Sequence, residues 1–395
     1  MTIDTKYITD FYGIHNGYAV FAIGRGRNKR YGIIDRDGKI VAEPEFWEST
    51  VWFSNDRYIE CCTTASYNPR YRLFDTKSGR WVAIDPNRRP WPIPGHDGLF
   101  FTSTKRYRRG IQDWKGRQIM PEKYRYIGCI GNNFIVENPQ TGCFGIFTSS
   151  GEQIVPFSLK YGKICAGGID APTLAEKDGK WVYLDDQGKI IASKGIPEFP
   201  ADVEWIYPTK QYVIYRGGEW DKCGMLDEYG HEIIPPIYNN IFPFNKKYVT
   251  TCIYNSPRAG LKDLSGNVII PANYTFSPIS GDDDLIIIHI NNKQFNNTSD
   301  AGIVQIQPDG SMSEIIPALY CIPYMEYSDM IVAAPWRAFR GKRKPGHFGV
   351  FSLKGELLIP FEYDEIRWGN DPERIAVCKG DKWFFINLKN ERTLF

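Results

Sequence analysis

The feature that most constrains how this chain folds is a glycine that returns at a regular interval, each time after the same kind of segment. Typical segments are Tyr31-Gly-Ile-Ile-Asp and Phe348-Gly-Val-Phe-Ser, each followed within a few residues by the recurring glycine. We number ten repeats by these anchors, with Asn replacing Gly in the last: Gly38, Gly79, Gly116, Gly151, Gly188, Gly230, Gly266, Gly310, Gly355 and Asn390. Their spacing of 35 to 45 residues is typical of repeat architectures. Residues 1–395 are therefore predicted to form a single repeat domain.

A tight turn is predicted at every anchor. Asp stands three residues before several anchors, as at Asp35 and Asp227, and Thr148, Ser352 and Asn387 occupy the same slot elsewhere. A type I turn favours Asp, Asn or Ser at its first position and Gly at its fourth, where φ is positive. Asn is the residue that best replaces Gly in that conformation.

Apolar runs around each turn predict three short strands per repeat. One run precedes a loop, the second carries the aromatic-Gly pair, and the third follows the turn. A proline five residues after the anchor, as at Pro156 and Pro360, is expected to end the third strand because proline cannot donate a ladder hydrogen bond. An aromatic residue three positions later, such as Phe46 or Tyr363, is expected to fill the next layer. The predicted fold class is all-β, with about ten short antiparallel meanders.

These segments resemble the WG repeat, also called KWG, which is found in many bacterial proteins. Lys180-Trp-Val-Tyr-Leu-Asp and Lys382-Trp-Phe-Phe-Ile-Asn keep the tryptophan of that repeat, and other copies keep its glycine. The resemblance covers essentially the whole chain. It implies a β-repeat architecture but no established activity, because a fold alone does not define a function.

The two chain ends are complementary in the repeat pattern. The last repeat stops soon after Asn390, whereas residues 6–21 begin with a segment of the kind that follows the other anchors. Pairing of the N- and C-terminal segments would supply the missing piece and remove exposed sheet edges. We therefore expect a closed, propeller-like ring. An open β-solenoid and two five-repeat rings divided near residues 193–202 are the alternatives.

Composition gives no sign of a strongly charged partner or of a membrane. Lys and Arg number 48 against 46 Asp and Glu, a formal charge of +2. The first residues lack the basic and apolar regions of a secretory signal, and no apolar run is long enough to span a bilayer. The nine cysteines are scattered without a CxxC motif, which favours reduced core residues. A cytoplasmic protein is the expectation.

Basic and aromatic residues gather in the loops that precede the second strand of certain repeats. In a closed ring, the loops of repeats 9, 10, 1, 2 and 3 would form a continuous basic arc. Each loop by itself is also compatible with a solvated hairpin tip. The candidate partner-binding residues are Arg25, Arg27, Arg30, Lys105, Arg106, Tyr107, Arg108, Trp336, Arg337, Phe339, Arg340, Lys342, Arg343 and Lys344.

Arginine and aromatic side chains are typical anchors of protein interfaces. The predicted function is therefore a non-enzymatic protein-binding scaffold or an inhibitor of the immunity type, acting on a protein with an acidic surface. Nucleic acid is a possible but less favoured partner because the net charge is small. A carbohydrate- or polyanion-binding lectin-like module and a glycan-processing enzyme are the alternatives. The five histidines lie in different repeats and form no metal-binding or catalytic motif, so no catalytic residue, metal or cofactor is predicted.

Overall fold

The computed structural model describes residues 7–47, 52–54, 57–63, 69–103, 109–191, 199, 203–217, 222–253, 259–279, 282–291, 299–322, 330–339 and 342–393. Within these ranges the chain forms β-strands, with a 3-10 turn at Gly26–Asn28. The predicted all-β class is confirmed. Among the described residues, no helix has the length and apolar character needed to cross a membrane.

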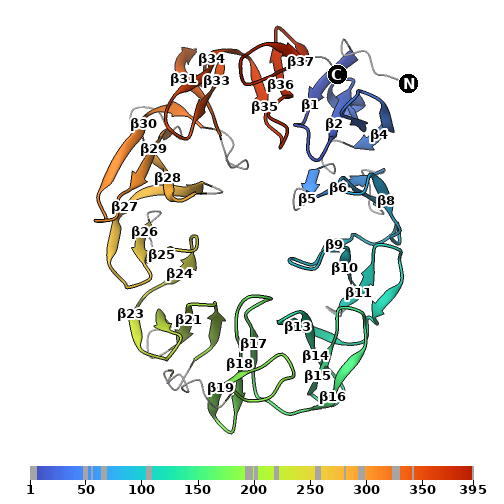
Figure 1. The fold of residues 1–395 in the computed structure, drawn as a ribbon, viewed down its shortest axis with the longest axis vertical. Helices are drawn as coiled ribbons and strands as arrows, with labels where there is room; N and C mark the ends of the chain where they lie inside the picture. The colour runs from blue at the N-terminus through green and yellow to red at the C-terminus, as the bar shows by residue number, and fades with distance from the viewer. Residues whose placement is uncertain are drawn as a thin grey trace. The chain divides into compact units, whose positions relative to one another are not determined.

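The chain divides into two compact units. The terminal unit comprises Met1–Val82 and Tyr274–Phe395 and therefore contains both chain ends, whereas the middle unit comprises Ala83–Asn273. Neither boundary falls near residues 193–202, most of which lie outside the described ranges. Figure 1 follows the strands of both units in chain order, from blue to red.

In the terminal unit the strands form consecutive antiparallel meanders. Repeat 1 contains β1 (Ile8–Phe11), β2 (Tyr18–Ile23), β3 (Arg30–Asp35) and β4 (Ile40–Trp47), and repeat 2 contains β5 (Trp52–Ser54), β6 (Tyr58–Cys62), β7 (Tyr71–Asp75) and β8 (Arg80–Val82). Repeats 8 and 9 contain β28 (Asp282–Asn291), β29 (Ser299–Ile306), β30 (Met312–Cys321), β31 (Met330–Phe339), β32 (Lys342–Pro345), β33 (Phe348–Ser352) and β34 (Leu357–Tyr363). Repeat 10 contains β35 (Glu365–Arg367), β36 (Ile375–Lys379), β37 (Lys382–Ile386) and β38 (Arg392–Thr393).

The middle unit repeats the same arrangement. Repeats 3 and 4 contain β9 (Trp91–Pro92), β10 (Leu99–Ser103), β11 (Arg109–Asp113), β12 (Gln118–Met120), β13 (Arg125–Ile130), β14 (Asn133–Asn138), β15 (Cys143–Phe147) and β16 (Gln153–Leu159). Repeats 5 and 6 contain β17 (Ile164–Ala166), β18 (Thr173–Lys177), β19 (Lys180–Leu184), β20 (Trp205–Pro208), β21 (Tyr212–Gly217), β22 (Lys222–Asp227) and β23 (Glu232–Tyr238). Repeat 7 contains β24 (Asn240–Pro243), β25 (Tyr248–Cys252), β26 (Ala259–Asp263) and the beginning of β27 (Val268–Ile279), which continues into the terminal unit.

Most sheets have one strand more than the three predicted per repeat. The strand order β1-β2-β3-β4 is typical of these sheets. In the other sheets of this kind, the first strand comes from the end of the preceding repeat. The aromatic residue lies at the end of the last strand of its own sheet, as Phe46 does in β4 and Tyr363 in β34, and the segment after it crosses to the next sheet and becomes its first strand. In repeat 5 the described residues form three strands.

The predicted anchor turns are confirmed. All ten anchors lie in the described ranges and have positive φ, from +62° at Asn390 to +93° at Gly230. At nine of them the anchor N–H donates to the carbonyl three residues earlier, and Gly79 donates to Asp75. At Asp227 the carboxylate also accepts the backbone N–H groups of Tyr229 and His231, each at 2.8 Å. The turn residues thus close each hairpin by local hydrogen bonds.

The expectation that proline ends the third strand is wrong for several repeats. Strands β16 and β34 run through Pro156 and Pro360. Both strands are bulged at this point, since the ladder passes from the Ile146–Val155 pair to the Phe144–Leu159 pair. A bulge on an edge strand leaves a position that needs no backbone donor, and proline fits there.

The core consists of apolar clusters between the sheets. In repeat 1, the ring of Phe21 lies so close to Gly32, the glycine of the aromatic-Gly pair in β3, that a side chain at Gly32 would collide with it. Phe46 lies opposite Tyr31 in the ladder and packs with Phe74 of the next sheet. The predicted role of this aromatic in filling the next layer is therefore confirmed at Phe46. Equivalent clusters join repeats 8 to 10 and the repeats of the middle unit.

The chain ends meet within the terminal unit, where β1 and β37 lie side by side (Figure 1). The ring of Phe11 packs edge-on against Phe385 at 5.0 Å between centroids. The N–H of Asn370 donates to the carbonyl of Ile14 at 2.8 Å. The first and last strands nevertheless belong to separate sheets, so the predicted strand pairing is replaced by packing of one sheet on the other. Side-chain contacts alone hold the last sheet against the first, whereas consecutive repeats are also joined by the chain itself.

Candidate binding surfaces

The most basic described feature is a two-stranded ribbon in repeat 9. Strand β31 pairs with β33 over Met330–Ala333 and then continues past that sheet to pair with β32. In this extension Trp336 lies opposite Pro345, and Arg337 lies opposite Lys344. Arg337 and Lys344 are both exposed. The ribbon, residues 336–339 and 342–345, is thus held by main-chain pairing and presents the cationic side chains of Arg337 and Lys344 to solvent.

The second basic feature is the loop between β2 and β3. Arg25 and Arg27 are exposed on the 3-10 turn and its N-terminal flank. Arg30 is half-buried, because its guanidinium lies 3.8 Å above the ring of Trp47 and donates to the carbonyls of Arg27 and Lys29. Arg25 and Arg27 are therefore exposed at the surface, whereas Arg30 stabilises the loop.

Acidic residues of repeat 10 connect these two basic features. His347, just after the ribbon, lies 3.2 Å from the carboxylate of Asp364. Asp364 also accepts the N–H of Gly380 at 2.7 Å, and the next residue, Asp381, pairs with Arg25 at 3.7 Å. The ribbon base, the β36–β37 turn and the β2–β3 loop consequently lie along one rim of three adjacent sheets. That rim is cationic at its ends and acidic in the middle.

Several predicted site residues cannot be placed. Lys105, Arg106, Tyr107, Arg108 and Arg340 lie outside the described residues. For Phe339, Lys342 and Arg343 the backbone is described as part of the ribbon but the side chains are not. The structure describes the remaining candidates of repeats 1 and 9 one by one, and their joining with repeat 3 into one binding surface stays a prediction.

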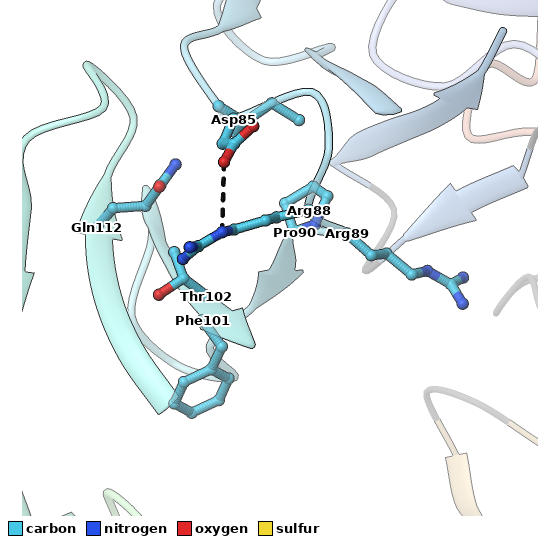
Figure 2. Close-up of a pocket in the computed structure, with 8 residues that line it drawn as sticks. Asp85, Arg88, Arg89, Pro90, Phe101, Thr102 and Gln112 are labelled. Carbon is cyan, nitrogen blue, oxygen red and sulfur yellow. Dashed lines mark ion pairs between the residues drawn. The ribbon is translucent and has the colours of Figure 1, made fainter. Parts of the chain in front are cut away.

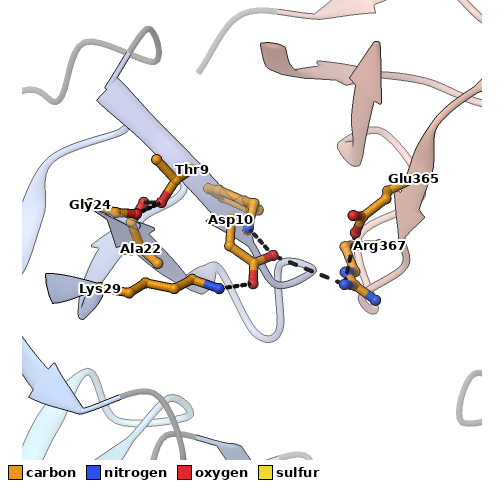
Figure 3. A network of polar contacts seen from close by, with 8 residues as sticks. Thr9, Asp10, Ala22, Gly24, Lys29, Glu365 and Arg367 are labelled. Atoms are coloured by element: carbon orange, nitrogen blue, oxygen red, sulfur yellow. Dashed lines mark hydrogen bonds and ion pairs between the residues drawn. The ribbon is translucent and has the colours of Figure 1, made fainter. Parts of the chain in front are cut away.

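Beneath the β2–β3 loop, a partly buried ionic network joins the first and last sheets (Figure 3). Lys29 donates to Asp10 at 2.7 Å, and both side chains are less than one-fifth exposed. Arg367 lies 4.0 Å from the other oxygen of Asp10 and pairs with Glu365 at 2.8 Å. Despite its burial, the pKa of Lys29 is raised because Asp10 and Tyr31 accept its hydrogen bonds. This network orients the base of the loop and is unavailable to a partner.

A small pocket in the middle unit is lined by charged side chains that neutralise one another (Figure 2). Arg88 pairs with Asp85 at 3.3 Å and also with Glu122. Arg89 lies over the ring of Trp91 at 4.6 Å. The cavity volume is about 10 Å³, which is about the space of one water molecule and far below the range usual for small-molecule sites.

Buried histidine and cysteine side chains give no sign of an activated nucleophile. His96 lies 3.5 Å from the thiol of Cys129, which is also 3.2 Å from the hydroxyl of Tyr126. Burial lowers the pKa of His96 and raises the pKa of Cys129, and both shifts favour the neutral pair. Among the described residues, no group of three His, Cys, Asp or Glu side chains is placed to hold a metal ion.

Comparison with known proteins supports the repeat. The model of the WG containing repeat matches residues 31–58, 224–254 and 348–383. Three segments of the chain match this repeat. The predicted resemblance is confirmed over these segments, and each match includes the strand glycine and the anchor turn of repeat 1, 6 or 9. No curated protein matches the sequence.

Several solved structures share some geometry with this WG-repeat chain. A eukaryotic initiation factor is 14% identical with a TM-score of 0.42, covering 78% of this chain and 87% of that one. The CRINKLY WD40 ectodomain of an Arabidopsis thaliana receptor kinase is 11% identical with a TM-score of 0.33, covering 67% and 99%. An uncharacterized protein from Listeria monocytogenes EGD-e is 14% identical with a TM-score of 0.35, covering 71% and 98%. These TM-scores are low, so the fold of this chain is defined by its own strands and their pairing.

The sequence did not lead us to expect the acidic residues in the middle of this rim. Asp381 and Asp364 belong to repeat 10, far along the chain from Arg25, and only the packing of the last sheet on the first brings Asp381 to Arg25. A signal was present, because Gly380-Asp381 is a two-residue hairpin turn in which both residues have positive φ. Such a short connection keeps its acidic side chain close to the rim.

Proposed function

We propose that this protein is a cytoplasmic, non-enzymatic scaffold in which the ten repeats close into a propeller-like ring and one rim binds an acidic protein. The ring is supported by the packing of repeat 10 on repeat 1, the one junction that the continuity of the chain does not impose. An inhibitor of the immunity type is a concrete form of such a scaffold.

The observation that carries the proposed binding is the ribbon at residues 336–339 and 342–345. The ribbon extends past the β31–β33 pairing, so its cationic residues are not needed to complete that sheet. Within the described part of the chain the exposed Arg337 side chain makes no hydrogen bond or ion pair. Arginine and aromatic residues together are the usual anchors of protein interfaces. Electrostatic attraction to an acidic surface would also accelerate association.

Charge reversal tests this proposal. The variant Arg337→Glu/Lys344→Glu should lose partners that the wild-type protein retains from native lysate at low salt. Lys354→Glu is the matched control, since Lys354 is exposed at the anchor turn, at the other end of strand β33. We expect a stoichiometric protein partner, retained by Lys354→Glu after nuclease treatment, whose affinity falls by about tenfold or more in the ribbon variant.

Two results would contradict the proposal. Equal retention of the partner by the ribbon variant and the control would show that the ribbon does not bind it. Loss of all retention after nuclease treatment would instead identify nucleic acid as the partner, because phosphate contacts dominate such binding. Melting temperatures of both variants should equal that of the wild type, which separates loss of binding from loss of structure.

A further inference from the structure

A single Asn-Gly pair occurs in the sequence, and it forms the turn between β1 and β2. Asn16 and Gly17 both have positive φ, +50° and +82°. The flanking His15 and Tyr18 exchange two backbone hydrogen bonds of 2.7 and 3.0 Å. Asn-Gly is the preferred sequence of such a two-residue turn. It is also the pair in which a backbone nitrogen most readily attacks the preceding side-chain amide, because glycine has no side chain to hinder the approach.

This turn is clamped against repeat 10 by backbone contact. A side chain at Gly13 would collide with the carbonyl of Trp368, and one at Gly369 would collide with the backbone of Ile14. The N–H of Asn370 donates to the carbonyl of Ile14 at 2.8 Å. Glycines on both sides thus let residues 13–14 and 368–370 lie directly against each other. We call this contact between repeats 10 and 1 the junction.

The side chain of Asn16 takes part in the junction. Its Oδ1 accepts a hydrogen bond from Nδ2 of Asn370 at 3.2 Å, and the Asn16 backbone N–H donates to Oδ1 of Asn370 at 2.8 Å. Its Nδ2 donates to the hydroxyl of Thr76 in repeat 2 at 3.0 Å. That hydroxyl is buried and gives its one hydrogen to the carbonyl of Arg57 at 2.6 Å, so the group that faces it has to be a donor. Asn16 therefore joins repeats 10, 1 and 2 through its amide.

The closed junction opposes attack on this amide. In the reaction the Gly17 nitrogen bonds to Cγ of Asn16 in a five-membered ring, and this ring requires rotation about the Cα–C bond of Asn16 out of the turn conformation. The side chain must then leave both Asn370 and Thr76. Asn16 lies at the surface, so water reaches it whether the junction is closed or open. The step that the reaction requires is therefore the opening of the junction.

We propose that Asn16-Gly17 is a deamidation site gated by the junction, and that its reaction makes an opening of the junction lasting. In the open state the Gly17 nitrogen attacks Cγ of Asn16. The new N–Cγ bond replaces the Cγ–Nδ2 bond, and Nδ2 leaves as ammonia with the proton of the Gly17 amide. Water then opens the cyclic imide at either of its two carbonyls and gives aspartate or isoaspartate. The chain needs no reactant except water.

Both products destabilise the closed junction. Aspartate places a carboxylate oxygen where Nδ2 of Asn16 faced the Thr76 hydroxyl, so two acceptors meet unless that hydroxyl gives up its bond to Arg57. Isoaspartate adds a carbon atom to the backbone of the two-residue turn, which changes the geometry that keeps β1 and β2 in register. A modified chain therefore recloses less readily where its ends meet. This device depends on the age of the molecule and is independent of the binding proposed for the ribbon.

Peptide mass spectrometry of protein aged in mildly alkaline buffer measures the conversion of Asn16. The urea-unfolded chain gives the unprotected rate, and the folded wild type should react more slowly by about tenfold or more. Asn370→Ala removes both contacts of its side chain to Asn16 and should accelerate the reaction in the folded protein by about tenfold. Thr76→Val removes one contact and should accelerate it less. Asn267→Ala is the matched control, because the Asn267 side chain donates to Asp263 within an anchor turn of the middle unit.

Equal rates in the folded and the unfolded wild type would overturn the gating, and so would a folded Asn370→Ala that reacts no faster than the wild type or the control. A cooperative melting transition shows that each variant is folded, and Thr76→Val carries the test if Asn370→Ala does not fold.

Hydrogen exchange tests the lasting effect on the junction. In aged, deamidated protein the backbone N–H of Asn370 should exchange faster than in fresh protein, whereas the backbone N–H groups of the middle unit should exchange as before. Unchanged exchange at Asn370 after complete conversion would overturn this part of the proposal. The ribbon variant Arg337→Glu/Lys344→Glu should deamidate like the wild type, and partner capture uses fresh protein, so this proposal and the binding proposal fail separately.

Discussion

Replacing Phe11 tests whether side-chain packing holds the two ends of the chain together. Phe11 is 1% exposed and lies edge-on to Phe385, with planes at 83°, and beside Trp383 at 6.3 Å between centroids. Removing such a ring leaves a cavity, and Phe→Ala changes in cores cost about 3–5 kcal/mol. Part of that cost belongs to the aromatic pair itself, for which about 0.5–1.5 kcal/mol is usual. We expect Phe11→Ala to lower the free energy of unfolding by about 3–5 kcal/mol in all.

A double-mutant cycle isolates the contact between the ends. Phe11→Ala and Phe385→Leu should be non-additive by about 0.5–1.5 kcal/mol in urea unfolding. Phe134→Ala is the control for Phe11→Ala, since Phe134 is fully buried in the middle unit, and it should add to Phe385→Leu within about 0.5 kcal/mol. A cost below about 1 kcal/mol for Phe11→Ala, or strict additivity with Phe385→Leu, would refute packing of the first sheet on the last.

Two further predictions concern a buried histidine and an anchor turn. Burial lowers the pKa of His15 from 6.5 to about 4, so the unfolded chain binds the proton more tightly than the folded one. The free energy of unfolding should therefore fall by up to about 3 kcal/mol as the pH drops from 6.5 to 4. In urea unfolding, the stability of His15→Gln should depend less steeply on pH over this range. Gly266→Ala should destabilise by more than the usual penalty of about 1–2 kcal/mol for positive φ, because its methyl group would meet the carbonyl of Ile233. Gly142→Ala, at φ +67° in open space, should incur that penalty alone, and equal melting temperatures of the two variants would contradict the steric argument.

The turns could be predicted from the sequence because their cause is local. Gly310 and Asn390 share neither sequence neighbours nor chain region, yet both adopt positive φ where the repeat pattern requires it. The strands through Pro156 and Pro360 could not be predicted in the same way. Whether a proline ends a strand or sits in a bulge depends on the register of the partner strand, and that register appears only after folding.

The kinds of residue at the candidate site could be predicted from the sequence, but the residues that contact them could not. Exposed Arg25 and Arg337 follow from their places near hairpin ends, which are usually solvated. The pairing of Arg25 with Asp381 depends on how the last sheet packs on the first. The repeat pattern predicts that the chain ends meet, but not which side chains face each other there.

The distribution of these features suggests where such a repeat can vary. The anchor glycine and the strand glycine are fixed by turn geometry and by packing between sheets, so a change at either of them costs stability. Two places remain free of these requirements, namely the loop between the second and third strands of each sheet and the exposed position on the first strand. Repeat 10 closes that loop with Gly380-Asp381, whereas repeat 9 extends it into the ribbon on the same rim. The first-strand position opposite the middle of the second strand holds Gly128 in one sheet and Trp91 in another. Differences confined to these two places alter what the surface can bind while the sheets and their packing stay the same.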